Sequence, residues 1–205
     1  MSPLDIILAT KNADKIKEIR SALVLPGIRF IENRSLLPAV EDGATFVENA
    51  LIKARKASEQ SGKAALADDS GLQVDALQGA PGIYSARFAG ENASDRENNE
   101  KLLKLMRAYP EKGREGQFYA AVVLYFPSGE WIHAEGSCRG LILESPRGGG
   151  GFGYDPLFYL PSLKKTMAEL TLEEKNALSH RSRALSRLRE KLFSEEFRSL
   201  LNITP

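Results

Sequence analysis

The chain begins with an apolar run that passes directly into a helical pattern, and this pairing restricts the fold more than any other feature. Residues 5–10 are mostly apolar, which predicts a short buried strand. Ile16, Ile19 and Leu23 then recur at helical spacing and predict one apolar helix face. A strand, a short turn and a helix N-terminus together form an anion site, because the first helical amides lack partners and the helix dipole is positive there.

The turn between this strand and this helix carries polar and basic residues. Thr10 and Asn12 are both candidates for the helix N-cap. Lys11 and Lys15 add positive charge that would attract a phosphate group. The turn does not have the P-loop pattern, so these residues taken alone also fit a surface helix with solvated lysines.

Two adjacent acids, Asp68 and Asp69, follow the apolar run 64–67. Buried carboxylates are costly unless they are paired, solvated or bound to a metal, and carboxylate oxygens suit Mg²⁺. Neighbouring strand residues point to opposite faces, so at most one of the two is expected to face a shared site, while the other bonds backbone or a lysine. We expect the strand to end at residues 68–71 and another to follow over 72–77; an Asp-rich turn is the alternative to a metal site.

A second unusual segment is a run of glycines at residues 148–151, followed closely by Phe152, Tyr154 and Asp155. Consecutive glycines indicate backbone with positive φ, or backbone that another group approaches closely. A flat ligand could stack on the rings while the carboxylate reads its edge. The alternative is a flexible glycine turn that leads into an ordinary core strand.

Charge and composition exclude several classes of protein. The formal net charge of the 205 residues is only +1, so nothing draws the whole chain toward nucleic acid or an anionic membrane. One cysteine and two histidines rule out an internal disulfide and make a cysteine- or histidine-rich metal site a poor expectation. No signal peptide and no apolar run of about 18 residues are visible. We expect a cytoplasmic protein without membrane or nucleic-acid partners.

Five short motifs occur in order and together are highly specific. They are ATKNADK at residues 9–15, ADDSGL at 67–72, GAPGIYSAR at 79–87, GFGYDP at 151–156 and EKNALSHR at 174–181. In this order they resemble the inosine triphosphate pyrophosphatase family, the Ham1-like pyrophosphatases of non-canonical purine nucleotides. The resemblance runs from about residue 7 to residue 188. One departure is Lys11, which stands where many relatives have glycine.

The resemblance implies a fold and an activity. The implied fold is α/β: an elongated mixed β-sheet flanked by helices, with two lobes and a central nucleotide-binding cleft, in a single domain over residues 1–205 that usually forms a homodimer. The implied activity is the Mg²⁺-dependent hydrolysis of ITP, dITP and XTP to the monophosphate and pyrophosphate, which cleanses the nucleotide pool.

The resemblance also implies roles for individual residues. Asp69 would be the general base and a magnesium ligand, with Glu41 as second ligand, Asp68 in support and Lys15 as the other catalytic residue. The implied substrate-binding residues are Thr10, Lys11, Asn12, Ala13, Asp14 and Lys15 for the triphosphate, Ser70 for the nucleotide, and Phe152, Gly153, Tyr154 and Asp155 for the base, with Lys175, His180 and Arg181 closing that pocket.

Two other functions are compatible with parts of the sequence. A Maf-like pyrophosphatase for pyrimidine or modified nucleotides would share the acids and lysines, but motifs 151–156 and 174–181 argue against it. A nucleic-acid-binding module could use the basic helix predicted over residues 183–197. The near-neutral net charge and the clustered acids disfavour that second reading.

Overall fold

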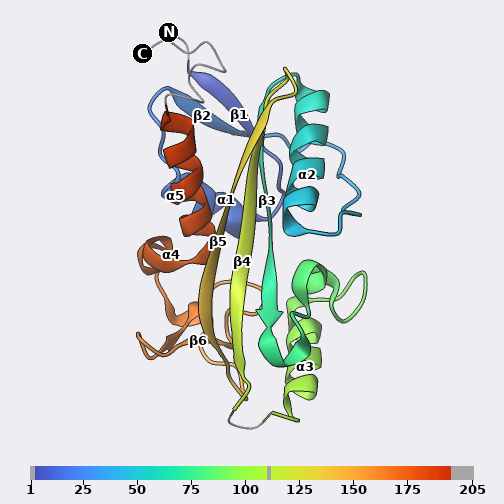
Figure 1. Ribbon diagram of the computed structural model, residues 1–205, viewed down its shortest axis with the longest axis vertical. Helices are drawn as coiled ribbons and strands as arrows, with labels where there is room; N and C mark the ends of the chain where they lie inside the picture. The colour runs from blue at the N-terminus through green and yellow to red at the C-terminus, as the bar shows by residue number, and fades with distance from the viewer. Residues whose placement is uncertain (1–2, 110–111, 195–205) are drawn as a thin grey trace. The chain divides into compact units, whose positions relative to one another are not determined.

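The computed structural model describes residues 3–109 and 112–194 of the chain (Figure 1). Its strands form one mixed sheet of seven in the order β2-β1-β3-β4-β5-β6-β7, and helices flank it. This confirms the predicted α/β class. The chain divides into two compact units. We call residues 1–69, 120–136 and 181–205 the first unit, and residues 70–119 and 137–180 the second unit.

The helices and strands follow one another in a regular order. The first part of the chain contains β1 (Leu4–Leu8), α1 (Ala13–Ala22), β2 (Ile28–Glu32), α2 (Phe46–Ser61) and β3 (Ala64–Val74). Next come two short 3₁₀ helices (Asp75–Leu77 and Gly82–Arg87), α3 (Asp95–Met106), β4 (Glu115–Tyr125) and β5 (Trp131–Ile142). The last part contains β6 (Phe158–Leu160), β7 (Lys165–Thr166), a 3₁₀ turn (Met167–Glu169), α4 (Leu172–Leu178) and α5 (His180–Phe193).

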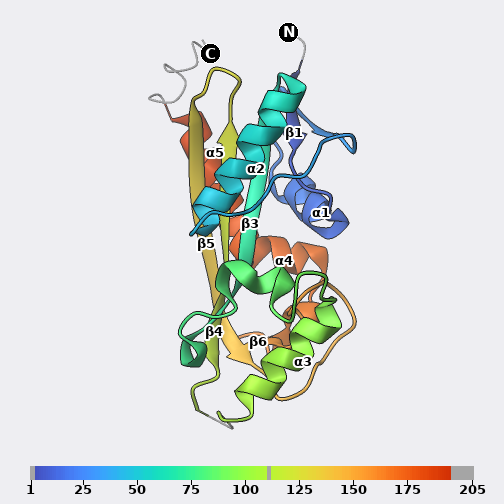
Figure 2. The same cartoon turned by 90° about the vertical axis from the view of Figure 1, so that its right-hand side faces the viewer.

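In the first unit, helices cover both faces of a parallel set of strands. β1 pairs in parallel with both β2 and β3. Successive strand residues point to opposite faces, so Ile6 and Leu8 pack with α1 and α5, whereas Ile7 packs with α2. The turned view shows α2 lying along β3 (Figure 2). The predicted apolar face of α1 is confirmed, because Ile16 and Ile19 are buried in this core.

The connections of the first unit decide where a ligand would bind. The chain leaves β1 through α1 to β2 on one side, and returns through α2 to β3 on the other. The helices therefore lie on opposite faces, and the carboxyl ends of β1 and β3 form the topological switch point of the sheet. Open α/β sheets bind their ligands at such a point.

Strand β3 differs from the sequence prediction. Residues 68–71 were expected to end one strand before a second began, but β3 continues without a break from Ala64 to Val74. The acids fit inside a strand because each has a basic partner, as described below. Gly71 serves close packing instead of a turn: a Cβ there would lie 2.4 Å from the carbonyl oxygen of Gly82 and from the hydroxyl of Ser85.

Helix caps agree well with the sequence patterns. The hydroxyl of Thr45 accepts a hydrogen bond from the amide of Glu48, as predicted for α2, and the Glu48 carboxylate accepts from the amide of Ala44. α2 ends at Gly62, which has left-handed backbone. Full capping boxes begin α3 and α4, at Ser94 and Thr171. None of the helices in the described ranges is long and apolar enough to span a membrane.

The second unit has its own apolar core. Side chains of β3, α3, β4 and β6 meet there, among them Leu72, Leu102, Phe118 and Phe158. The ring of Tyr154, from the segment after the glycine run, is also part of this core. This packing fixes the backbone of that segment.

Candidate functional site

The turn between β1 and α1 is held in place by its own side chains. The side-chain oxygen of Asn12 accepts hydrogen bonds from the amides of Asp14 at 2.9 Å and Lys15 at 3.0 Å. The hydroxyl of Thr10 accepts from the amide of Asn12 at 3.2 Å. Asn12 is therefore the cap among the two predicted candidates. Two of the first helical amides already have a partner, contrary to the expectation that they lack one.

Lys15 belongs to a chain of buried charges at the switch point. Its ammonium lies 3.1 Å from one carboxylate oxygen of Asp68. The other oxygen of Asp68 accepts from two nitrogens of Arg181, at 3.0 and 2.8 Å. Arg181 in turn pairs with Glu18, and both Asp68 and Arg181 are almost completely buried. Asp68 thus orients Lys15, and Arg181 orients Asp68.

The pKa values of these groups follow from burial and pairing. Burial lowers the pKa of the Lys15 ammonium, although the Asp68 carboxylate opposes this effect. Burial disfavours the ionised form of Asp68, yet Arg181 and Lys15 hold its pKa well below the usual range. Asp68 is therefore a permanent anion and a poor proton acceptor. In this low basicity Asp68 differs from its neighbour Asp69.

Asp69 points to the other face of β3, where it meets a lysine that sequence reasoning missed. The ammonium of Lys53, on α2, lies 2.9 Å from an oxygen of Asp69 and 2.9 Å from an oxygen of Glu41. The two predicted magnesium ligands are thus brought together around one cation. The prediction that adjacent acids face opposite sides of the strand is confirmed, as Asp68 pairs with Lys15 and Arg181 instead.

The position of Lys53 was visible in the sequence. Ala50, Ala54 and Ala57 form the buried stripe of α2, and Lys53 lies at the same helical spacing. A lysine on an otherwise apolar face indicates a buried carboxylate partner. Burial works against the Lys53 charge, but the carboxylates of Asp69 and Glu41 raise its pKa overall.

Asp69 has the features of a proton acceptor and of a metal ligand. Burial raises the pKa of its carboxyl, with Lys53 opposing, so its carboxylate is a stronger base than an exposed one. Its second oxygen is buried and has no hydrogen-bond partner among the described residues. Such an oxygen is ready to accept a further cation or a water proton.

Few protein ligands are available for a metal at this point. Within residues 3–109 and 112–194, no three Asp, Glu, His or Cys side chains lie close enough to hold a metal ion by themselves. Mg²⁺ does not require such a cage, since it commonly uses one or two carboxylates together with substrate phosphates and water. The pair Asp69 and Glu41, with the unpartnered Asp69 oxygen, fits that pattern.

In the second unit, the segment after the glycine run is built around Asp155. The carboxylate of Asp155 accepts from the amide of Phe152 at 3.0 Å and from the ammonium of Lys175 at 2.6 Å. The Lys175 ammonium also lies 5.6 Å from the centre of the Phe152 ring. A Cβ at Gly151 would lie 2.1 Å from the Asp155 carboxylate, which explains the glycine. Three predicted base-pocket residues, Phe152, Asp155 and Lys175, therefore form one cluster.

Two side chains of α3 hold the same segment and were not predicted. The carboxylate of Asp95 accepts from the amide of Gly153 at 2.6 Å, and the side-chain amide of Asn99 donates to the Gly153 carbonyl at 2.8 Å. Asp95 and Asn99 are four residues apart, which places them on one face of the helix. They fix both polar groups of the Gly153 backbone.

Two other residues predicted for the base pocket, Tyr154 and His180, are buried in the second unit. Tyr154 is buried, and its hydroxyl donates to the carbonyl of Ser85 at 2.9 Å. Phe152 is less deeply buried than Tyr154, so its ring is the better candidate for stacking on a base. His180 is buried against Phe118, with ring centres 4.9 Å apart, and Ser70 is half-buried on β3.

Arg181 is held by carboxylates within the first unit. Its side chain pairs with Asp68 and Glu18, and its predicted role in closing the base pocket stays a prediction. Three of its nitrogens are engaged by these carboxylates. This arrangement favours a positioning role toward Asp68.

The geometry can be compared with known proteins. The sequence profile of the Ham1 family matches residues 6–191. The chain belongs to this family. The match covers the whole range over which the motifs suggested the resemblance.

Curated relatives of the Ham1 type carry a specific name. The chain is 48% identical over 190 residues to a dITP/XTP pyrophosphatase of Desulforamulus reducens, covering 91% of this chain and 94% of the relative. It is 51% identical over 188 residues to a dITP/XTP pyrophosphatase of Halalkalibacterium halodurans, covering 89% and 95%. Both matches span almost the whole length of each protein.

Solved structures of Ham1 proteins have the same fold. A HAM1 protein from Coxiella burnetii superimposes with a TM-score of 0.84 at 44% identity, covering 92% of this chain and 98% of that one. The Ham1 protein of Staphylococcus aureus gives a TM-score of 0.81 at 41% identity, covering 92% and 97%.

Proposed function

We propose that this Ham1-family chain hydrolyses dITP, XTP and ITP to the nucleoside monophosphate and pyrophosphate. The observation that carries the proposal is the group formed by Asp69, Lys53 and Glu41 beside the switch point of the sheet. It supplies a buried carboxylate base next to a phosphate-attracting turn. The names of the curated relatives support the same substrates.

In the proposed reaction, water attacks the α-phosphorus and pyrophosphate leaves. Asp69 accepts the proton of the attacking water, because burial raises the pKa of its carboxyl and one oxygen is unpartnered. Lys53 fixes the orientation of that carboxylate through its other oxygen. Asp68 cannot take this role, because its paired carboxylate is too weak a base.

Lys15 would stabilise negative charge that develops on the phosphates. Its ammonium is held in place by Asp68, Asp68 is held by Arg181, and Arg181 is held by Glu18, so little reorganisation is needed when substrate binds. A fixed donor of this kind is commonly worth about 3 kcal/mol in the transition state.

We also propose that Asp69 and Glu41 hold Mg²⁺ together with the substrate phosphates. The fit rests on the unpartnered oxygen of Asp69 and on an excess of carboxylates over cations in the surrounding cluster. When bound, the ion would neutralise phosphate charge and lower the pKa of its bound water. Lys53 lies between the same two carboxylates and would have to share them.

Recognition of the base is proposed for the second unit. The cluster of Phe152, Asp155 and Lys175 offers an aromatic ring that is not fully buried and a buried ion pair. A donor directed at position 6 of the purine would accept the oxygen of hypoxanthine or xanthine and reject the amino group of adenine. Guanine also carries an oxygen at position 6, so a second donor or a tight wall would have to refuse its 2-amino group. Buried mismatches of this type discriminate by roughly 10⁴-fold.

A substrate panel tests the proposal. Pyrophosphate release is measured from dITP, XTP, ITP, GTP and ATP, with and without Mg²⁺, for the native chain and for Asp69→Asn. We expect rapid release from the first three only, with Mg²⁺ required, and loss of turnover in a folded Asp69→Asn variant. Turnover by Asp69→Asn would remove Asp69 from the base role, and preference for a pyrimidine nucleotide would favour a Maf-like activity.

The assembly and the location are further proposals. The family resemblance favours a homodimer, which light scattering would detect as about twice the 22.5 kDa mass of one chain. A cytoplasmic location follows from the proposed substrates, since that compartment holds the nucleotide pool.

A further inference from the structure

Glu41 lies on a segment that little apolar packing supports. This Glu41 segment, residues 33–45, joins β2 to the start of α2. All of these residues lie in the described ranges, and none of them is buried or belongs to a strand or helix. Leu36 contacts the core, but Leu37 and Val40 expose 69% and 75% of their surface. Hydrophobic burial therefore contributes little to the position of Glu41.

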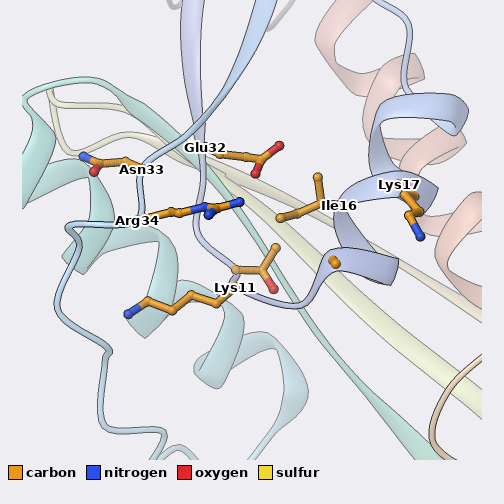
Figure 3. Close-up of a pocket in the computed structure, with 8 residues that line it drawn as sticks. Lys11, Ile16, Lys17, Glu32, Asn33 and Arg34 are labelled. Atoms are coloured by element: carbon orange, nitrogen blue, oxygen red, sulfur yellow. The ribbon is translucent and has the colours of Figure 1, made fainter.

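A cavity beside the start of the Glu41 segment removes a further source of support. Asn33 and Arg34 line it from the segment, and Thr10 and Ala13 line it from the turn before α1 (Figure 3). Its volume is about 390 Å³, much larger than the small voids of a close-packed interior. The segment is therefore not fixed by close packing where it leaves β2, and the position of Glu41 has to be set from its other side.

Backbone pairing does not fix the middle of the Glu41 segment either. Within the part of the chain that the structure describes, no backbone group of residues 37–43 bonds to another backbone group. Holding an irregular segment in one conformation costs conformational entropy at every residue. Side chains from elsewhere must therefore hold these residues in place.

Two carboxamide side chains of α2 supply the missing partners. The Gln60 side chain accepts from the amide of Leu37 at 2.8 Å and donates to the carbonyl of Leu37 at 3.1 Å. The Asn49 side chain accepts from the amide of Gly43 at 2.9 Å. Glu41 lies between these two anchored residues, so the backbone on both sides of it is attached to α2.

The same helix carries the cation that Glu41 contacts. Asn49, Lys53 and Gln60 are separated by four and seven residues, which places them along one side of α2. The Lys53 ammonium lies 2.9 Å from an oxygen of Glu41 and 2.9 Å from an oxygen of Asp69. α2 therefore determines the backbone of the segment and the partner of its carboxylate together.

We propose that Gln60 and Asn49 are positioning residues, which hold the Glu41 carboxylate near Asp69 before metal and substrate bind. This inference rests on the proposed function, in which Glu41 and Asp69 share Mg²⁺. Gln60 lies about 10 Å along the helix axis from Lys53, so it acts through the segment and not on the reacting atoms. A Glu41 that is already in place loses little conformational freedom on metal binding. The anchors should therefore affect the Mg²⁺ requirement and leave kcat nearly unchanged.

Gln60→Met is the direct test, because Gln60 is exposed and the variant should fold. The Mg²⁺ concentration for half-maximal hydrolysis of dITP is expected to rise about tenfold, the effect of losing two neutral hydrogen bonds. At saturating Mg²⁺, kcat should stay near its native value, as should Tm. The control Glu59→Met changes an exposed neighbour that makes no hydrogen bond within the described residues. An equal Mg²⁺ requirement in both variants would overturn the proposal.

Gly43→Ala tests the second anchor. A Cβ at Gly43 would lie 2.8 Å from the side-chain oxygen of Asn49 and 2.7 Å from the Cβ of Glu48, so the hydrogen bond to Asn49 cannot keep its geometry. The Mg²⁺ requirement is expected to rise as in Gln60→Met, again with kcat preserved. A native Mg²⁺ requirement in Gly43→Ala would overturn the role given to Asn49.

Hydrogen exchange of single amides, followed by NMR without metal or nucleotide, gives a readout besides activity. In Gln60→Met the amides of Leu37 and Gly43 should both exchange about tenfold faster, because the whole segment is released, while the amides of α2 keep their native rates. Faster exchange at Leu37 alone would show a local bond that does not hold the segment, and would overturn the proposal. If the native chain hydrolysed no purine triphosphate, the proposed function would fail, while the exchange rates would still report on the anchors.

Discussion

Replacement of Asp68 by asparagine tests the buried charge chain. Asp68 is only 2% exposed and bonds to Arg181 at 3.0 and 2.8 Å and to Lys15 at 3.1 Å. Asparagine keeps the shape but removes the carboxylate charge beside Lys15 and leaves Arg181 with the Glu18 carboxylate. Breaking a buried pair in this way costs about 3–5 kcal/mol of unfolding free energy. At this chain length each kcal/mol moves Tm by about 2–4 °C, so we expect Asp68→Asn to lower Tm by about 10 °C.

Scanning calorimetry and urea denaturation measure this loss, and Asp75→Asn is the matched control. Asp75 also makes two hydrogen bonds to one arginine, Arg139, at 3.1 and 2.6 Å, but both side chains are about half exposed. Exposed pairs contribute about 0–1 kcal/mol, so the control should barely change Tm. An equal loss of Tm in Asp68→Asn and Asp75→Asn would contradict the claim that the buried ion pairs of Asp68 stabilise the fold more than an exposed pair does.

Three other variants test separate parts of the account. Lys53→Met should lower kcat on dITP at least about tenfold in steady-state kinetics, because Asp69 loses the donor that orients it; a native kcat would refute this. Asp95→Ala should raise KM about tenfold and largely spare kcat, because it releases the backbone of Gly153; an unchanged KM would count against it. Two basic partners lower the pKa of Asp5 to about 2 in the folded chain. Asp5 therefore stabilises the fold fully above its unfolded-state pKa of about 4, and this stabilisation is lost as the pH falls toward 2. The difference in Tm between Asp5→Asn and the native chain should accordingly shrink between about pH 4 and pH 2, and should stay constant toward alkaline pH.

Local patterns in the sequence predicted much of the first unit. The periodicity of Ile16 and Ile19 gave α1, and Thr45 gave the start of α2, because helix faces and caps depend on residues a few positions apart. The position of Asp68 and Asp69 after an apolar run predicted acids that need pairing, solvation or a metal. Opposite directions for their side chains followed from strand geometry alone.

The features that the sequence did not predict depend on contacts between residues far apart in the chain. Asp68 and Arg181 are 113 positions apart, so their pairing could not be read from spacing. The same pairing lets β3 continue through residues that read as a turn. Lys53 was overlooked because the alanines around it indicated only a buried face, and its carboxylate partners come from other segments.

The oxygen atom of the attacking water tests the central claim most directly. Hydrolysis of dITP in water labelled with heavy oxygen is followed by mass spectrometry of both products. Attack at the α-phosphorus, with Asp69 as the base, places the label in the nucleoside monophosphate, and Asp69→Asn forms no labelled product. Label in pyrophosphate or in orthophosphate would show attack at another phosphorus and would contradict the proposed reaction.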